Sequence, residues 1–322
     1  MPLSRRTLII VSIFLIILIG LATLLYLSSL EPSDYTYSQI NWSPDGKYVA
    51  FITTANAMTS GIDIFSVQDM KFVNSGIGAS PGVFPPHFSW SPDSQSVAFV
   101  SYQGIHDGIY RANIDGSNLE NLTDDVLLPR NPDWSPDGRR IAFDIFSGQV
   151  YIVNVDGANL VRLTSRNEDA GIPAWSPDGR FIAYQVHEGS GSAVYIMNAD
   201  GSNYTRLADF RDVGSDLIWS PDGNKIILVS EEATRFYVVD TIQPQIITQV
   251  IENDSLLPIV WSPDSTRIAY MTAEGLVVKN IQTDTLKQIS SDVVDNLFWK
   301  TPGQILSLDM LNRRVLTFPV ND

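Results

Sequence analysis

The stretch that decides the fold is IPAWSPDGRFIAY, residues 172–184, because its core phrase recurs along the whole chain. The chain has seven tryptophans, and each one opens a copy of that phrase, the last copy being the degenerate WKTPG. Copies spaced by about 40 to 45 residues are typical of the blades of a β-propeller. The copies begin at Trp42, Trp90, Trp134, Trp175, Trp219, Trp261 and Trp299.

Each copy predicts a tight turn between two strands. Ser-Pro-Asp-Gly fits a type I turn, with serine first, proline second and glycine fourth. A short apolar run follows at once, such as RIAFDI at 140–145 or FIAYQV at 181–186. β-Branched and aromatic residues between turn signals are typical of strands. Each tryptophan is therefore expected to end one strand, and the turn to begin the next.

Two more strands are expected in each unit. A third run follows, such as QVYIVNV at 149–155, and in three units it leads into Asp-Gly, at Asp115, Asp156 and Asp200, a strong hairpin signal. A fourth run comes next, such as LVRLT at 160–164. Four antiparallel strands per unit predict an all-β propeller.

The number of blades depends on the last unit, which ends after its third strand. Residues 33–37 could supply a fourth strand, but residues 35–41 are needed as the first strand of blade one. We expect a seven-bladed propeller of four-stranded antiparallel blades, with three strands in the last. The alternative is a six-bladed ring capped by the degenerate unit.

An apolar segment precedes the repeats. No charged residue occurs between Thr7 and Leu30, and twenty helical residues span about 30 Å, the thickness of the hydrocarbon core. The run is longer than the apolar part of a cleavable signal peptide and lacks its small-residue site. We expect a cytoplasmic N-terminus at 1–6, a transmembrane signal-anchor helix at 7–30 and a propeller domain at 31–322. A removed signal peptide is the alternative.

The charges that flank the apolar segment predict its orientation. Arg5 and Arg6 precede it, and Glu31 and Asp34 follow it. Because positive flanks tend to stay inside, the chain is expected to be a single-pass protein of the cytoplasmic membrane, with the propeller in the periplasm or outside the cell. The chain has no cysteine, so the exported domain must rely on its core rather than on disulfides.

The repeat resembles the TolB-type, WD-like propeller repeat, PxWSPDGxxIAF followed by an aliphatic-Tyr strand and a DG turn. The match is close at residues 172–184 and at PDWSPDGRRIAF, residues 132–143, and the resemblance extends from about Tyr35 onward. It implies a platform for protein contacts in the bacterial cell envelope. TolB itself carries an α/β domain ahead of a six-bladed ring, whereas here the repeats follow the apolar segment directly. A role in the Tol system therefore does not carry over.

The conspicuous residues of the repeat have structural explanations. The tryptophans are expected to pack between adjacent blades. The aspartates of the turns can accept hydrogen bonds within their own turns. These aspartates are Asp45, Asp93, Asp137, Asp178, Asp222 and Asp264.

Catalytic motifs are sparse in the sequence. Without cysteine there is no thiol nucleophile and no thiolate metal site. His87, His106 and His187 are scattered and show no metal-ligand spacing, and no GxSxG motif occurs. We therefore expect no enzyme and no cofactor. The alternative is an enzyme or small-ligand receptor at the channel mouth, with these histidines and Tyr102 supplying the chemistry.

Charge is the remaining clue to function. The net charge of −15 argues against nucleic acid and anionic lipid as partners. Acidic residues gather in the loops that lead from one blade into the next, so one face of the ring is expected to be acidic and to bind a basic protein of the envelope, or a cation. The same charges could serve solubility alone. The candidate residues are Asp124, Asp125, Glu168, Asp169, Asp209, Asp212, Asp216, Asp292 and Asp295, with Glu252 and Asp254 in the same set of loops.

Overall fold

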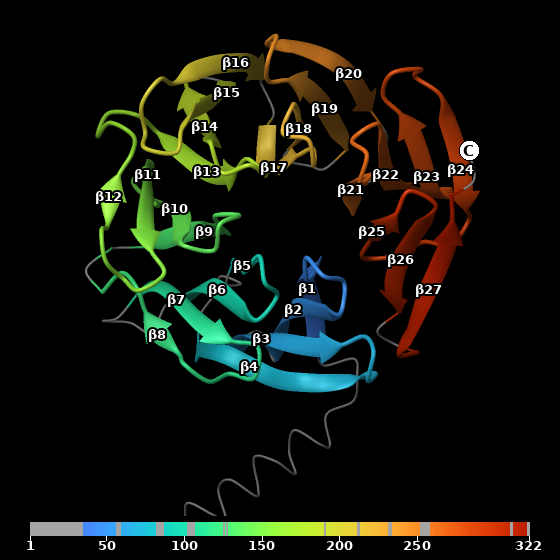
Figure 1. Cartoon of the computed structure of the whole chain (residues 1–322), viewed down its shortest axis with the longest axis horizontal. Coiled ribbons are helices and arrows are strands. Elements are labelled where there is room, and N and C mark those ends of the chain that lie inside the picture. Colours follow the sequence, from blue (N-terminus) through green and yellow to red (C-terminus); the bar gives the residue numbers. More distant parts are fainter. Residues whose placement is uncertain are drawn as a thin grey trace, which may run out of the picture.

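The computed structural model describes residues 35–55, 59–81, 87–101, 107–124, 126, 128–189, 191–210, 213–230, 234–251, 258–309 and 312–320. These residues form twenty-seven strands in seven sheets, arranged radially around a central axis (Figure 1). The predicted transmembrane helix at 7–30 lies outside them. Over the ranges given above, no helix is long and apolar enough to cross a membrane.

The strands follow the repeats closely. Blades one and two consist of β1 (Tyr35–Trp42), β2 (Tyr48–Ala55), β3 (Thr59–Ser66), β4 (Lys71–Pro81), β5 (Phe88–Trp90), β6 (Ser96–Ser101), β7 (Gly108–Asn113) and β8 (Glu120–Asn121). Blades three and four consist of β9 (Pro129–Trp134), β10 (Arg140–Ile145), β11 (Gln149–Asn154), β12 (Val161–Arg162), β13 (Ala170–Trp175), β14 (Phe181–Glu188), β15 (Gly191–Asn198) and β16 (Thr205–Phe210).

The remaining three blades continue the same order. They consist of β17 (Val213–Trp219), β18 (Lys225–Ser230), β19 (Arg235–Asp240), β20 (Gln245–Ile251), β21 (Ile259–Trp261), β22 (Arg267–Thr272), β23 (Gly275–Asn280), β24 (Leu286–Ser290), β25 (Phe298–Thr301), β26 (Gln304–Asp309) and β27 (Arg314–Pro319).

The sheet topology confirms seven blades. Six sheets have four antiparallel strands in sequence order, and the seventh, β25-β26-β27, has three within the described part of the chain. Strand β1 pairs with β2, so residues 35–42 belong to blade one, as predicted. The six-bladed ring with a cap is wrong, because the degenerate unit forms a sheet of its own.

The Ser-Pro-Asp-Gly turns have the predicted geometry. In blade four the N–H of Gly179 donates to the carbonyl of Ser176 at 2.9 Å. Asp178 Oδ1 accepts the Ser176 hydroxyl at 2.7 Å and the Arg180 N–H at 3.0 Å. Burial alone would raise the pKa of Asp178, but these hydrogen bonds and the Arg180 guanidinium outweigh it and hold the pKa below 3.8. The aspartate therefore stabilises its own turn.

Replacing Asp178 by alanine should lower the free energy of unfolding by about 1 to 2 kcal/mol, since its hydrogen bonds with the Ser176 hydroxyl, the Arg180 N–H and the Arg180 guanidinium are lost. Because the pKa of Asp178 lies below 3.8 in the folded chain, this contribution is present at neutral pH and disappears as the pH falls below that value. Urea denaturation at pH 7 measures it. Asp178→Asn, which keeps an acceptor, should lose less; equal losses would contradict a hydrogen-bonding role.

The tryptophans join neighbouring blades, as predicted. Trp219 Nε1 donates to the carbonyl of Ala174 in the preceding blade at 3.0 Å, and Trp261 Nε1 donates to that of Ile218 at 3.0 Å. Trp175 is buried, with the Arg140 guanidinium of blade three 4.7 Å from its ring centroid. The repeat therefore supplies the contacts between blades as well as the turns within them.

Side chains close the ring where blade seven meets blade one. Trp42 of blade one donates from Nε1 to Asn296 Oδ1 at 3.0 Å, and its ring stacks on Phe298 with centroids 5.3 Å apart. Leu308 of blade seven is buried in one cluster with Val49 and further core residues of blade one. Within the described residues, closure rests on this packing rather than on a shared sheet.

Candidate interaction face

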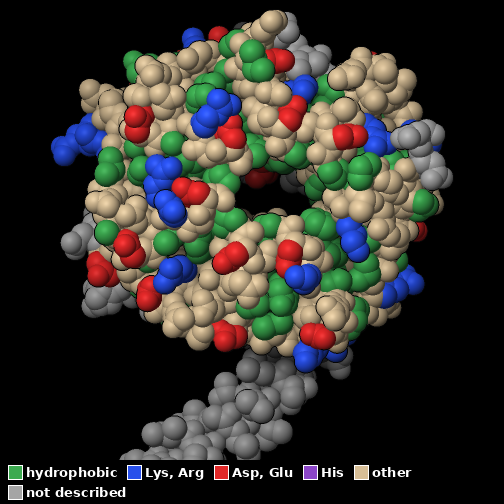
Figure 2. Space-filling model, in the orientation of Figure 1, with side chains coloured by type: hydrophobic (Ala, Val, Ile, Leu, Met, Phe, Trp, Pro, Cys, Tyr) green, Lys and Arg blue, Asp and Glu red, His purple; other side chains and the backbone are tan. Residues whose placement is uncertain are grey.

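The strand order gives the ring two different faces. The Trp-Ser-Pro-Asp turns and the turns between third and fourth strands lie on one side, which we call the turn face. The crossover loops between blades and the loops between second and third strands lie on the other side, the loop face. Figure 2 shows one face, on which acidic and basic side chains are interspersed around a central opening.

The predicted acidic residues lie on the loop face, at different depths. Asp125 and Asp212 of the candidate set lie outside the described residues, as do Glu252, Asp254, His106 and Tyr102. Glu168 and Asp216 are partly buried. The exposed members are Asp124, Asp169, Asp209, Asp292 and Asp295.

Some of these carboxylates already accept a hydrogen bond or form an ion pair within their own loop or blade. Glu168 Oε2 accepts the N–H of Ser165 at 3.0 Å, and Asp292 Oδ2 accepts the Ser290 hydroxyl at 3.0 Å. Asp209 forms an ion pair with Arg206 of the same strand. In contrast, the carboxylates of Asp124, Asp169 and Asp295 form no hydrogen bond or ion pair within the part of the chain that the structure describes.

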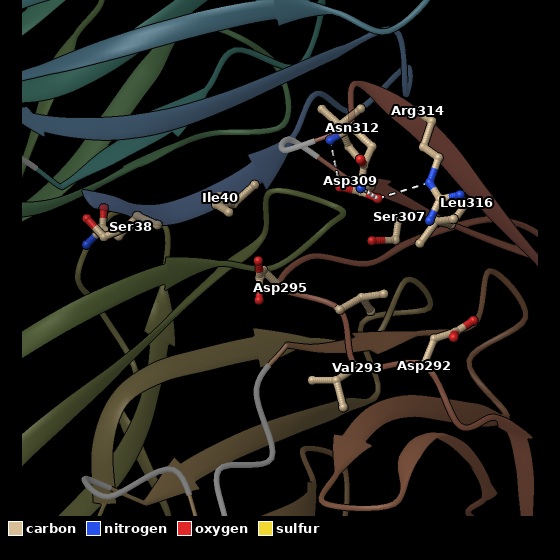
Figure 3. A pocket seen from close by; sticks show the side chains of 13 residues that line it. Ser38, Ile40, Asp292, Val293, Asp295, Ser307, Asp309, Asn312, Arg314 and Leu316 are labelled. Carbon is tan, nitrogen blue, oxygen red and sulfur yellow. Dashed lines mark hydrogen bonds and ion pairs between the residues drawn. The ribbon is translucent and has the colours of Figure 1, made fainter. Parts of the chain in front are cut away.

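Two of the predicted residues meet at a cavity of about 780 Å³ on the loop face of blade seven (Figure 3). Asp292 and Asp295 line it from one crossover loop. Asp309, which the sequence did not single out, lines it from β26 and accepts Arg314 Nε at 3.0 Å. The wall also carries apolar side chains, among them Leu316. The cavity is therefore amphipathic with acidic edges.

A second cavity, of about 820 Å³, lies where inner strands of several blades face one another. Gln39, His87, Asp216 and Asp295 line it from four different blades. Gln39 Nε2 lies 3.0 Å from His87 Nδ1. Burial lowers the pKa of His87 below 6.5, against the opposing effect of Asp144, and burial raises the pKa of Asp216. At neutral pH the imidazole is therefore uncharged.

The described histidines do not form a metal centre. His87 belongs to blade two, whereas His187 of blade four lies exposed, with Nδ1 3.0 Å from the Ser192 hydroxyl. Across the described ranges, no group of three or more His, Asp or Glu side chains could hold a metal ion.

A polar cluster around Asp144 is one that the sequence did not predict. Asp144, in the second strand of blade three, is fully buried and forms an ion pair with Arg130 at 2.7 Å. The signal was present in RIAFDI, because Asp144 stands at a position where other units have aliphatic residues, such as Ile52 and Val229. The apolar run around Asp144 predicts a strand with or without the aspartate, so the strand pattern does not single it out.

A second, partly buried aspartate lies between blades three and four. Asp133 directly precedes Trp134, and its Oδ2 accepts the backbone N–H of Trp175 at 2.6 Å. Burial raises the pKa of Asp133 to about 7, more than the backbone hydrogen bonds from Trp175 and Trp134 can offset. This group is close to titration at physiological pH.

The sequence that forms this seven-bladed ring matches a known protein family. The profile of the TolB beta propeller domain matches residues 28–170 and 83–256, which together cover more than half of the chain. The chain belongs to this family. The family assignment agrees with the resemblance seen in residues 172–184.

Individual relatives of this TolB-type propeller are distant. An uncharacterized protein of Agrobacterium fabrum is 28% identical over 114 residues, which is 34% of this chain and 36% of that protein. The match thus spans little more than a third of the relative's length.

Solved structures share the fold at low sequence identity. A protein from Agrobacterium tumefaciens assigned as TolB has a TM-score of 0.53 and 20% identity over 74% of this chain and 91% of its own. An oligogalacturonate lyase in complex with manganese has a TM-score of 0.63 and 14% identity over 90% of this chain and 92% of its own. At these identities the likeness shows the fold alone.

Proposed function

We propose that this chain is a protein-interaction module of the bacterial cell envelope, anchored in the cytoplasmic membrane by residues 7–30 and binding a basic partner through its loop face. The observation that carries the proposal is the different use of carboxylates on the two faces. The turn aspartates, such as Asp178, are hydrogen-bonded within their turns, whereas Asp124, Asp169 and Asp295 lack such partners among the described residues. Exposed, uncompensated charge is available to attract a basic surface and speeds encounter with it.

Membership of the TolB beta propeller domain family supports a platform for protein contacts. The charge of −15 supports a basic partner over a nucleic acid. The uncharged stretch from Thr7 to Leu30 and the arginines ahead of it support the membrane anchor and the export of the propeller.

Affinity capture from envelope extracts, with the full chain in mild detergent, tests the partner and the face together. Changing Asp124, Asp169, Asp209 and Asp295 to asparagine should abolish capture of a basic protein. The matched control changes Asp115, Asp156, Asp200 and Asp284 to asparagine, which alters the net charge equally on the turn face. Equal capture by both variants would contradict the proposal.

The topology has its own test. A reporter enzyme that is active only outside the cytoplasm, fused after Asp322, should be active in cells. Changing Arg5 and Arg6 to glutamate should reduce that activity, since the positive flank sets the orientation. Full activity from a reporter that works only in the cytoplasm would contradict export.

A second candidate function is a small-ligand site in the channel. The observation that favours it is the meeting of His87, Asp216 and Asp295 at one cavity of about 820 Å³, since pockets with a few convergent polar groups are typical ligand sites. A thermal-shift screen of small metabolites tests it. A metabolite whose thermal shift disappears in the Asp216→Asn variant would support this function. The absence of any thermal shift in the screen would count against it.

A further inference from the structure

Blade three buries a charge at a position where most other blades bury an aliphatic side chain. Asp144 lies on the second strand ten residues after the tryptophan of its repeat, and its side chain is 0% exposed. At the same spacing four other blades have the buried residues Ile52, Val100, Val229 and Met271. Blade four has the uncharged Gln185, and blade seven, whose repeat is degenerate, has Asp309. Burying a carboxylate costs free energy that an aliphatic side chain does not. Other blades fold with an aliphatic residue at this position. Folding alone therefore does not explain why blade three has Asp144.

Asp144 fixes the position of the Arg130 guanidinium. Its Oδ2 accepts hydrogen bonds from Arg130 Nε at 3.1 Å and Nη2 at 2.7 Å. Its Oδ1 accepts Asn131 Nδ2 at 2.8 Å and the backbone N–H of Ile172, in the next blade, at 3.3 Å. With four donors around it, the carboxylate is rigidly placed, and one side of the Arg130 guanidinium is fixed with it.

The Nη1 side of that guanidinium remains available to a binding partner. Arg130 is 37% exposed, and its Nη1 donates to no other described residue. The ring of Phe146 lies with its centroid 5.4 Å from the Arg130 Cζ, although this phenylalanine is 69% exposed. Leu128 is also exposed, and its carbonyl accepts the Phe146 N–H at 3.0 Å. Arg130, Phe146 and Leu128, together called the Arg130 anchor, thus combine a fixed cation with exposed apolar surface.

We propose that the Arg130 anchor binds a carboxylate of the partner, from a Glu or Asp side chain, next to an apolar side chain. Nε and Nη2 of Arg130 donate to Asp144 and to the carbonyl of Ile145, so its Nη1 is the group that can donate to a carboxylate. Phe146 and Leu128 offer apolar contact beside it. Arginine and aromatic residues are the types that dominate binding energy at interfaces. This inference rests on the proposed function: the acidic loop face attracts a basic partner, and one acidic residue of that partner fixes its position.

Two charge-neutral variant pairs test the anchor. Arg130→Gln with Asp144→Asn removes both charges but keeps groups that can hydrogen-bond, so no buried carboxylate is left alone. The control is Arg111→Gln with Glu120→Gln, which removes the ion pair of 2.6 Å between the outer strands of blade two. Thermal unfolding of the full chain establishes that each variant is folded before binding is measured.

The probes are two fluorescent, capped peptides, Lys-Lys-Leu-Glu-Lys-Lys and its twin with Gln in place of Glu. An acidic face alone would favour the Gln peptide, because it carries the higher positive charge. The anchor predicts the opposite: the unchanged protein should bind the Glu peptide about tenfold more tightly. Fluorescence anisotropy at low salt measures both affinities.

The outcomes separate the anchor from the proposed function. The Arg130→Gln, Asp144→Asn variant should lose the preference for Glu, and the control pair should keep it. If the unchanged protein prefers the Gln peptide, the anchor is overturned while binding of basic partners stands. If neither peptide binds, both the anchor and the proposed function are overturned.

Discussion

Replacing Trp175 by alanine is expected to lower the free energy of unfolding by about 3 to 5 kcal/mol, the usual cost of emptying a large buried aromatic site. Trp175 packs in a buried cluster with Ala142 and Ile152 of the preceding blade. The variant would also lose the stacking of Arg140 on the indole ring. Because this side chain bridges two blades, its loss should weaken the ring and not just one sheet. Chemical denaturation at pH 7 measures the change.

Two further variants show whether burial between blades is the cause. Trp175→Phe keeps an aromatic ring and should cost clearly less than alanine. Phe146→Ala removes an aromatic side chain that is 69% exposed and should leave stability within about 0.5 kcal/mol of the unchanged protein. A Trp175→Ala protein with an unaltered unfolding curve would show that the repeat tryptophans do not hold the blades together.

Replacing Asp133 by asparagine is expected to remove a large part of the pH dependence of stability. The pKa of Asp133 is about 7 in the folded chain, against 3.8 for an unperturbed aspartate. Between these values the folded chain holds a proton that the unfolded chain has released, so stability falls as the pH rises through this window. The contribution of Asp133 over the whole window is about 4 kcal/mol.

The comparison that measures this effect is the slope of unfolding free energy against pH from 4 to 8. Burial also raises the pKa of Asp63, Asp144 and Asp216, which adds a slope of the same sign to both proteins. His87, whose pKa is lowered, acts in the opposite direction in both. The difference in slope between the unchanged protein and the Asp133→Asn variant therefore measures the contribution of Asp133 alone. Identical slopes would mean that Asp133 does not titrate in this range.

The architecture was predictable because its signals are local and repeated. Proline, aspartate and glycine fix each turn by their own backbone preferences, and apolar runs on both sides fix the strands. The seven copies of the repeat favoured seven blades, and the degenerate WKTPG copy left a six-bladed ring with a cap as the alternative until the sheet topology decided between them. Closure through Trp42, Asn296 and Phe298 was not predictable, since it joins residues that are more than 250 positions apart in the sequence.

The binding face was predictable in outline only. Strand order places the crossover loops on one face, so the positions of residues such as Asp124 and Asp295 followed from topology. Which charges remain uncompensated depends on tertiary contacts. The pairing of Asp209 with Arg206 and the burial of Asp216 could not be derived from a pattern of charges.

The backbone conformation of the inner strands near the channel could also not be predicted from the sequence. Gln39, Asn131 and Ile172, each three residues before a tryptophan, have φ values of 49°, 49° and 54° in the left-handed region. Register shifts interrupt the pairing of their strands at these points. Asparagine adopts this conformation more readily than most residues, but Gln39 has no such preference and the β-branched Ile172 disfavours it. The packing of inner strands around the channel imposes it.

That a partner binds the loop face is tested most directly by cross-linking from two positions of equal exposure. Val293 on the loop face is 71% exposed and Ile242 on the turn face is 70% exposed, so a photoreactive amino acid at either position is equally accessible. In intact cells, the probe at position 293 should cross-link to a basic envelope protein, and the probe at position 242 should not. A cross-linked partner obtained from position 242 and not from position 293 would contradict binding through the loop face.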